Sequence, residues 1–191
     1  FSVYGALQLL QQHVSGLHVG GKGALAMYGV RHNLGSRETL VLWGDVRHTL
    51  PTWFTVRFPA RYVHANLFDW TDNTLPAKTL GTPPGQPEGL CVSVAERAVL
   101  EMLYDAGTRQ SLEEARNLFD GLRSPRKELL GQLLACCTSV KTVRLFLTWA
   151  RETEVVNADD LLARYSLRTG SNKRWMSHLA DGTLLSLNPH G

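Results

Sequence analysis

The hydrophobic pattern changes character near residue 90, and this change restricts the fold more than any other feature of the sequence. Before it come two short helical patterns and then strand-like apolar runs, the clearest of which alternates over residues 61–68. After it, apolar residues recur at helical spacing, and a strand-like tail closes the chain. This order predicts an α+β (mixed α/β) fold, in which N-terminal helices and a small β-sheet precede a helical part with a short C-terminal β element.

A segment rich in proline and glycine, residues 71–89, separates the two halves and predicts a loop or linker. Charge is also uneven, since residues 1–92 carry seven Lys or Arg and five Asp or Glu, against thirteen and twelve in the remainder. With 191 residues, 43% of them apolar, the chain can bury the core of one domain or of two small ones. We predict two subdomains, an α/β unit over residues 1–90 and a mainly helical unit over residues 91–191 with C-terminal strands.

Short elements are predicted in the N-terminal half. Apolar residues at helical spacing indicate helices at the start of the chain and after Gly21, with a buried strand between them. Pro59-Ala60 predicts a hairpin that joins the last two strands. The predicted elements are a helix over Val3–Val14, a strand over Leu17–Val19, a helix over Gly21–Gly29, a loop over Asn33–Arg37 and strands over Thr39–Trp43, Phe54–Phe58 and Arg61–Phe68.

Helix-start signals dominate the second half. Ser93 and Glu96 have the spacing of a capping box, in which the hydroxyl and the carboxylate each accept a hydrogen bond from a free backbone amide, and Ser111 begins a second one. Ser124-Pro125 predicts another helix, with an N-cap followed by proline at the first helical position. Further helices are predicted over Val140–Glu152 and Asn157–Arg164, and strands between Trp175 and Leu187 around Asp181-Gly182.

Cysteine and histidine usage argues against a metal centre. The three cysteines, Cys91, Cys136 and Cys137, are too few and too unevenly spaced for a disulfide framework or a four-ligand zinc site. Five histidines lie in the first half, but none has His-x-His or His-x-x-x-His spacing, so packing or surface roles are expected for them. We expect no metal and no cofactor. These histidines are His13, His18, His32, His48 and His64.

Residues Gly16–Gly23 match the first part of a phosphate-binding loop. The match fails at its end, because Gly23 stands where a hydroxyl would hold magnesium, and Gly16 lies at a helix end rather than after a strand. Gly20 and Gly21 are then expected to make a tight turn from strand to helix. Acidic pairs such as Glu113-Glu114 fall in first helical turns, where they favour the helix dipole. The sequence therefore predicts a protein that is not an enzyme.

The chain has no targeting or membrane signal. It lacks a run of about 18 apolar residues and a basic N-terminal segment followed by an apolar stretch, so a cytoplasmic protein without a membrane partner is expected. Its formal net charge of +3 permits an anionic partner without requiring one. Because the chain begins at Phe1 rather than Met and its first residues already indicate helix, an upstream segment is expected to be missing.

The helix predicted over Val140–Glu152 carries the most informative charge pattern. Its faces are apolar except for one stripe, on which Lys141, Arg144 and Arg151 lie together. Only Glu152 is placed to neutralise this stripe. We expect the three cations to face outward, either as a contact surface for an anionic partner or as an ordinary solvated face.

Two further groups of cations are candidates for partner or nucleic-acid binding. Arg126 and Lys127 lie near the start of a predicted helix, where cations oppose the helix dipole and an anion would relieve them. Lys173 and Arg174 follow Gly170 in a turn whose shape suits a phosphate or an acidic protein surface.

Four segments in order resemble the AbiEi antitoxins of type IV toxin–antitoxin (abortive infection) systems. His18–Leu25 resembles the family's His-Val-Gly-Gly-x-x-Ala-Leu, and Leu50–Phe54 resembles its Leu-Pro-x-Trp-Phe. Ser139–Leu147 is similar to its Ser-Val-Lys-x-x-Arg-Leu-Phe-Leu, and Leu167–Arg174 to its Leu-x-x-Gly-x-x-Lys-Arg. Together the four segments span most of the chain.

The resemblance implies an antitoxin that counteracts a nucleotidyltransferase toxin and contributes to transcriptional autoregulation of its operon. In the family, operator DNA is bound by an N-terminal winged helix-turn-helix; none precedes Phe1, so the chain resembles the C-terminal body. Lys141, Arg144, Lys173 and Arg174 are then expected to belong to the working surface. A stand-alone nucleic-acid-binding module or transcription regulator, using the same cations on phosphates, remains the alternative. Whether the surface meets DNA, RNA or toxin stays open.

Overall fold

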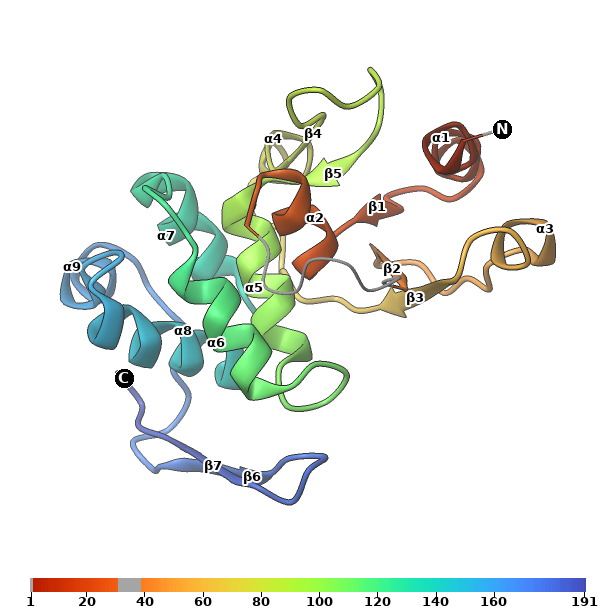
Figure 1. The fold of residues 1–191 in the computed structure, drawn as a ribbon. Helices are drawn as coiled ribbons and strands as arrows, with labels where there is room; N and C mark the ends of the chain where they lie inside the picture. The colour runs from red at the N-terminus through yellow and green to blue at the C-terminus, as the bar shows by residue number, and fades with distance from the viewer. Residues whose placement is uncertain (1, 31–38) are drawn as a thin grey trace.

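The computed structural model describes residues 2–30 and 39–191, and it is an α+β structure, as the sequence predicts (Figure 1). A mixed sheet lies beside a group of helices, and a separate two-stranded hairpin lies near the C-terminus. The loop predicted over Asn33–Arg37, and His32, fall outside the described residues.

The main sheet is built around the short strand β1 (His18–Val19). Within the described residues it has five strands in the order β3-β2-β1-β5-β4. β2 (Leu40–Gly44) pairs antiparallel with β1 and parallel with β3 (Ala60–His64). On the other side of β1, β5 (Val92–Ser93) runs parallel to it, and β4 (Leu80–Gly81) runs antiparallel to β5. The predicted strands at β1 and β2 are confirmed.

α5 (Ala95–Asp105) is the central helix of the molecule (Figure 1). It packs against α2 (Gly21–Met27) on the sheet side and against α7 and α8 on the other. One hydrophobic cluster contains buried residues from both sides of residue 90, and the division into two subdomains stays a prediction. The remaining helices are α1 (Val3–His13), α3 (Thr52–Thr55), α4 (Leu75–Lys78), α6 (Leu112–Asp120), α7 (Lys127–Cys136), α8 (Val140–Thr153) and α9 (Ala158–Arg164).

Two helix starts predicted from the sequence, at Ser111 and Asn157, are confirmed. The Ser111 hydroxyl accepts a hydrogen bond from the Glu114 amide at 3.1 Å and begins α6. The Asn157 side chain accepts from the Asp160 amide at 3.0 Å and begins α9. Each cap satisfies an amide that has no partner within its helix, which is the local signal that the sequence carries.

The capping box predicted at Ser93 is wrong, although the helix that follows it is present. Ser93 belongs to β5, and its hydroxyl donates to Glu101 Oε1 at 2.6 Å rather than accepting from the helix. Glu96 does not reach back to Ser93 either, because its carboxylate accepts hydrogen bonds from Arg126. Contacts distant in sequence therefore replace the local cap.

The helix predicted to start at Ser124-Pro125 begins at Lys127 instead. Ser124 has a left-handed backbone with φ +42°, and Arg126, which holds the N-cap position, makes no side-chain cap hydrogen bond. The reason is Glu96 of α5, whose Oε2 accepts the Arg126 backbone amide at 2.9 Å. A carboxylate from another helix thus occupies the N-terminus of α7.

The strand predicted over Phe54–Phe58 is wrong, and so is the hairpin at Pro59-Ala60. Thr52–Thr55 form α3, and the strand after it pairs in parallel with β2. Burial gives the reason: Phe54 is 0% exposed, whereas Val56, which would share its face in a strand, is 78% exposed.

Residues 71–89 are more than a loop, because they contain α4 and β4. Thr79, between these two elements, donates its hydroxyl to the Leu75 carbonyl at 2.7 Å, and its carbonyl accepts the Val94 amide at 3.0 Å. The predicted linker is therefore tied to the sheet.

The predicted C-terminal strands are confirmed as β6 (Trp175–His178) and β7 (Leu184–Leu187), an antiparallel pair. The turn between them includes Gly182 at φ +85°. Figure 1 shows this hairpin beside α8, at the end of the molecule away from α1.

Candidate functional site

Arg144 of α8 holds the turn that carries the predicted cations Lys173 and Arg174. Its guanidinium donates to the carbonyl of Thr169 at 2.7 Å, Ser171 at 2.7 Å and Lys173 at 2.8 Å, and also to that of Leu187 in β7 at 3.1 Å. A planar group with five N–H donors can satisfy several backbone carbonyls at once, and this compensates the cost of burying its charge. Arg144 therefore fixes the backbone from residue 169 to residue 173.

The expectation that Arg144 faces outward is wrong, because the residue is only 2% exposed. The helical wheel placed it correctly on a polar stripe, but at Arg144 the stripe is covered by the C-terminal turn and hairpin rather than by water. A helical pattern shows which face is polar; it does not show whether that polarity meets solvent or other backbone.

Lys141 is also engaged with backbone. Its ammonium donates to the carbonyls of Leu103, Tyr104 and Ala106 at 2.8, 3.0 and 2.6 Å, at the C-terminal end of α5. The Leu103 carbonyl also accepts the Ala106 amide at 3.2 Å. Because the last carbonyls of a helix lack the usual amide four residues further on, the lysine caps α5. Burial lowers the pKa of Lys141 to about 8, against the raising effect of Asp105.

The third residue of the stripe, Arg151, is exposed and paired. It donates to Asp159 at 2.8 Å and to the His190 carbonyl at 2.9 Å. Glu152, expected to neutralise the stripe, forms an ion pair with Arg116 of α6 instead. Asp159 at the start of α9 therefore takes the role predicted for Glu152.

Arg126 and Lys127 are paired with acids of neighbouring helices. Arg126 donates to Glu96 Oε1 at 2.9 Å, and Lys127 forms an ion pair with Asp160. Burial acts to raise the pKa of Glu96, but the hydrogen bonds from Arg126 outweigh it, and the pKa is lowered. The predicted repulsion between these cations and the helix dipole is thus relieved within the chain.

Lys173 and Arg174 differ from the other five predicted residues. Both are exposed, and neither forms an ion pair with an acid in residues 2–30 or 39–191. Arg174 donates to the Ser186 hydroxyl at 3.1 Å. Arg144 holds the backbone beneath these two cations, so their position on the surface is well defined.

Next to this turn lies a groove of about 730 Å³ between the end of α5, the start of α8 and β6. Its lining includes the cations Arg109 and Lys141, the rings of Tyr104 and Trp175, and His178. Its two walls are fixed to each other, because the Gly107 carbonyl accepts the Ala180 amide at 3.1 Å. The groove combines aromatic surface with basic groups.

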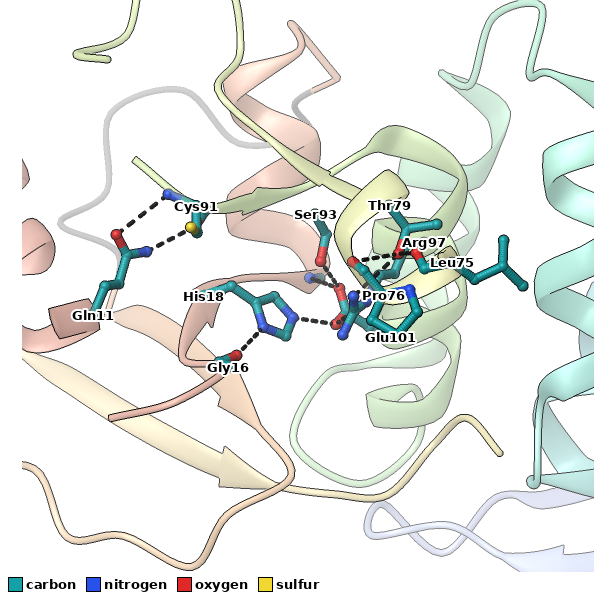
Figure 2. A network of polar contacts seen from close by, with 11 residues as sticks. Gln11, Gly16, His18, Leu75, Pro76, Thr79, Cys91, Ser93, Arg97 and Glu101 are labelled. Atoms are coloured by element: carbon teal, nitrogen blue, oxygen red, sulfur yellow. Dashed lines mark hydrogen bonds and ion pairs between the residues drawn. The ribbon is translucent and has the colours of Figure 1, made fainter. Parts of the chain in front are cut away.

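The His-Val-Gly-Gly segment belongs to a different, buried network (Figure 2). Both ring nitrogens of His18 lie near acceptors: Nδ1 is 2.8 Å from the Gly16 carbonyl and Nε2 is 2.7 Å from Glu101 Oε2. The imidazole ring therefore lies between a backbone carbonyl and a buried carboxylate. Arg97 Nε lies 3.6 Å from the same carboxylate oxygen, and Ser93 donates to the other.

Glu101 is the centre of this network. It is 2% exposed; burial acts to raise its pKa, but the charge and hydrogen bond of His18 outweigh it, and the pKa is lowered. Arg97 also lies over the rings of Phe68 and Trp70, 5.6 and 5.1 Å from their centroids. The buried charges are therefore compensated by one another and by polarisable surroundings.

The network explains why residues 16–23 look like a phosphate-binding loop. The Gly21 amide donates to Glu101 Oε1 at 3.2 Å, so a carboxylate of the chain itself takes the place of a phosphate. A Cβ atom on Gly20 would lie 2.7 Å from that same oxygen and 2.7 Å from a Trp43 ring carbon, so this position has no room for a side chain. The turn predicted for Gly20 and Gly21 is confirmed, and its anion is internal.

The sequence reasoning missed Arg97, Glu101 and Asp105, all of which are buried. A signal for them was present, since they lie four residues apart in a helix whose only other charged residue is Glu96, and they must share one face. Charged residues on a core face need partners, and here those partners come from β1, β3 and the turn after α5.

The fold and these contacts define an α+β protein in which most charged side chains of α5 and α8 bind backbone carbonyls or side chains of opposite charge. An exposed basic turn lies at one end of the molecule. The model of one protein family, described as "Transcriptional regulator, AbiEi antitoxin, Type IV TA system", matches residues 37–187. The chain belongs to this AbiEi antitoxin family, which is regulatory.

A solved structure with the same fold is the crystal structure of RV2827C protein from Mycobacterium tuberculosis, with a TM-score of 0.56 and 14% sequence identity. The similarity covers 92% of this chain and 65% of that one. The chain thus spans less than two thirds of that protein. None of the curated proteins matches. No helix in the described part of the chain is long and apolar enough to cross a membrane.

Proposed function

We propose that this chain is the body of a type IV antitoxin that counteracts a nucleotidyltransferase toxin in the cytoplasm, acting by binding rather than by catalysis. The observation that carries the proposal is the clamp of Arg144 on the turn over residues 169–173. Family membership supplies the toxin as the expected partner, and the clamp supplies a defined contact surface.

The turn has the properties of a binding element. Its backbone is fixed by charge-assisted hydrogen bonds, which contribute about 1.5–3 kcal/mol each when well formed. Its two exposed cations, Lys173 and Arg174, have no acidic partner within the described residues, so their charge is available to an anionic surface. A pre-ordered loop loses little entropy on binding, which favours affinity.

The other predicted cations support this surface in the proposal. Arg144 positions the turn, and Lys141 joins α8 to the end of α5. Arg151, Arg126 and Lys127 hold α9 and α7 in place through their acidic partners.

Co-expression with the cognate nucleotidyltransferase toxin tests the proposal. The double variant Lys173→Glu/Arg174→Glu is expected to lose most of its protection against the toxin while it stays folded. A matched control is Arg47→Glu/Lys78→Glu, which changes the net charge by the same amount at two exposed sites in the N-terminal half. Growth rescue by the first variant equal to that of the control would remove the turn from the mechanism.

We propose that the same family role includes autoregulation through operator DNA, in the full-length protein. A reporter fused to the operon's promoter measures this directly, with the full-length protein supplied in trans. If the basic turn contributes phosphate contacts, the Lys173→Glu/Arg174→Glu variant binds operator DNA more weakly, and the salt dependence of binding becomes less steep. Unchanged repression together with lost rescue would assign the turn to the toxin alone.

A further inference from the structure

A second cavity, of about 240 Å³, lies on the side of α5 opposite the Arg144 clamp and takes no part in the proposed function. It is enclosed by α2, β2, β3, the end of α5 and the turn that follows it. Its polar lining consists mainly of Lys22, Trp43, Arg61, Asp105, Arg109 and Gln110.

Three nitrogen donors in this lining are buried and lack a partner. Trp43 Nε1, Arg61 Nη1 and Gln110 Nε2 have no hydrogen-bond partner among residues 2–30 and 39–191. Trp43 and Gln110 are only 2% and 8% exposed, so bulk water does not reach these groups freely. A buried donor without an acceptor costs free energy, and three of them around one cavity call for an explanation.

The indole nitrogen of Trp43 lies close to Gly21, which lines this cavity. A Cβ atom built on Gly21 would lie 3.4 Å from Trp43 Nε1. The side chain of Arg61 leaves the sheet on the same face as that of Trp43. Val41 lies opposite Arg61 in the parallel pair of β2 and β3, and Val41 and Trp43 share one face of β2. The donors therefore converge from two neighbouring strands.

The charges at the cavity favour an anion. Lys22, Arg61 and Arg109 supply three positive charges, and Asp105 supplies one negative charge. The carboxylate of Asp105 is already held by Arg109 at 2.8 Å and by Arg61 at 3.4 Å. Lys22 pairs with Glu114 at 3.1 Å, so the local balance stays positive when that acid is included.

We propose that this cavity binds a small oxyanion of the phosphate class, held by the donors of Trp43, Arg61 and Gln110. An acceptor-only ligand suits a site in which the buried unpartnered atoms of the described lining are all donors, and a tetrahedral oxyanion offers acceptors in several directions. The volume is below the range of drug-sized sites, about 300–1,000 Å³, and fits a small ion rather than a nucleotide.

Isothermal titration of the chain with inorganic phosphate, against sodium chloride at equal ionic strength, tests the site. The wild type is expected to show saturable binding and a phosphate-dependent rise in Tm. Gln110→Leu keeps the side-chain volume and removes one donor, and it is expected to weaken phosphate binding about tenfold. Gln12→Leu, at an exposed position of α1, is the matched control and leaves binding unchanged.

A second readout separates lost binding from lost folding. Without ligand, Gln110→Leu is expected to be at least as stable as the wild type, because it removes a buried donor that has no partner. Trp43→Phe, which keeps an aromatic ring and removes Nε1, is expected to weaken binding as well. An absence of both saturable binding and a rise in Tm up to about 20 mM phosphate overturns the proposal, because a bound ligand well above its Kd raises the Tm. Equal affinity for acetate overturns the phosphate class, and binding unchanged in both variants overturns the location.

Discussion

Glu101→Gln is the substitution that most sharply tests the account of the buried core. The glutamine keeps the volume of the side chain but removes its charge. Its oxygen is required by the Gly21 amide and the Ser93 hydroxyl, both donors that lie on the Oε1 side. The amide nitrogen must then face His18 and Arg97, so Arg97 loses its buried counter-ion.

The expected loss follows from that last change. Removing one member of a buried ion pair costs about 3–5 kcal/mol. Arg97 keeps its hydrogen bond to Thr79 at 3.2 Å and the faces of Phe68 and Trp70, so we expect the lower end, about 3 kcal/mol. For a chain of 191 residues this corresponds to a fall in Tm of about 6–12 °C.

Urea unfolding at pH 7, followed by far-ultraviolet circular dichroism, measures the free energy of unfolding of each variant. The control is Glu114→Gln, whose partner Lys22 lies 3.1 Å away in a partly exposed pair, and whose loss is expected to cost about 0–1 kcal/mol. A loss below about 1 kcal/mol for Glu101→Gln would refute the assignment of Glu101 as the counter-ion of a buried cation.

The pH dependence of the unfolding free energy gives the sign of the Glu101 contribution. The pKa of Glu101 is lowered in the fold from its ordinary value of 4.5, so the carboxylate stabilises the fold above that pH, and the contribution is lost as the pH falls through the lowered pKa. The stability gap between wild type and Glu101→Gln is therefore expected to be constant near neutrality and to close in acid.

Three further outcomes are expected. Gly20→Ala places a Cβ atom 2.7 Å from both Glu101 and Trp43, and should lower the free energy of unfolding by about 1–3 kcal/mol in the same urea assay. The pKa of Lys141 is about 8 in the fold and 10.5 when unfolded, so the unfolded chain binds more protons between these two pH values. The free energy of unfolding of the wild type should therefore rise by up to about 3 kcal/mol relative to that of Lys141→Met as the pH rises through this window. Parallel curves of unfolding free energy against pH for the two proteins would contradict this. Burial raises the pKa of Cys137 to about 12 and Cys136 is buried, so a thiol reagent at pH 8 should modify Cys91 alone in the native protein and all three cysteines after denaturation.

The elements that sequence reasoning predicted correctly are those fixed by local signals. α6 and α9 begin where Ser111 and Asn157 place a side-chain acceptor next to free amides, and the C-terminal hairpin turns at its glycine. These interactions lie within three residues in sequence, so the pattern contains both partners.

The errors come from partners far away in sequence. Ser93 has the spacing of a capping box, but its hydroxyl donates to Glu101, and the carboxylate of Glu96 accepts from Arg126. Phe54 alternates with its neighbours as a strand residue would, yet it alone enters the core from α3. Propensity and spacing are overridden wherever tertiary packing or a buried charge offers a stronger contact.

The candidate site was predicted in its residues more than in its arrangement. The sequence identified Arg144, Lys173 and Arg174 as cations of one working surface, but the spacing of residues 144 and 173 carries no information about contact between them. Only the fold brings the guanidinium under the turn, where it donates to the Lys173 carbonyl at 2.8 Å. The role of Arg144 as a positioning residue could therefore not be read from the pattern.

The most direct test of the central claim is a double-mutant cycle between Arg144 and the cations of the turn, with rescue from the toxin as the readout. Arg144→Lys keeps the charge but cannot satisfy the carbonyls of Thr169, Ser171 and Lys173 in the same planar geometry. If Arg144 acts by holding the turn, Arg144→Lys reduces rescue on its own and adds nothing in the Lys173→Glu/Arg174→Glu background. Additive losses among variants that circular dichroism shows to be equally folded, or full rescue by Arg144→Lys, would contradict the account.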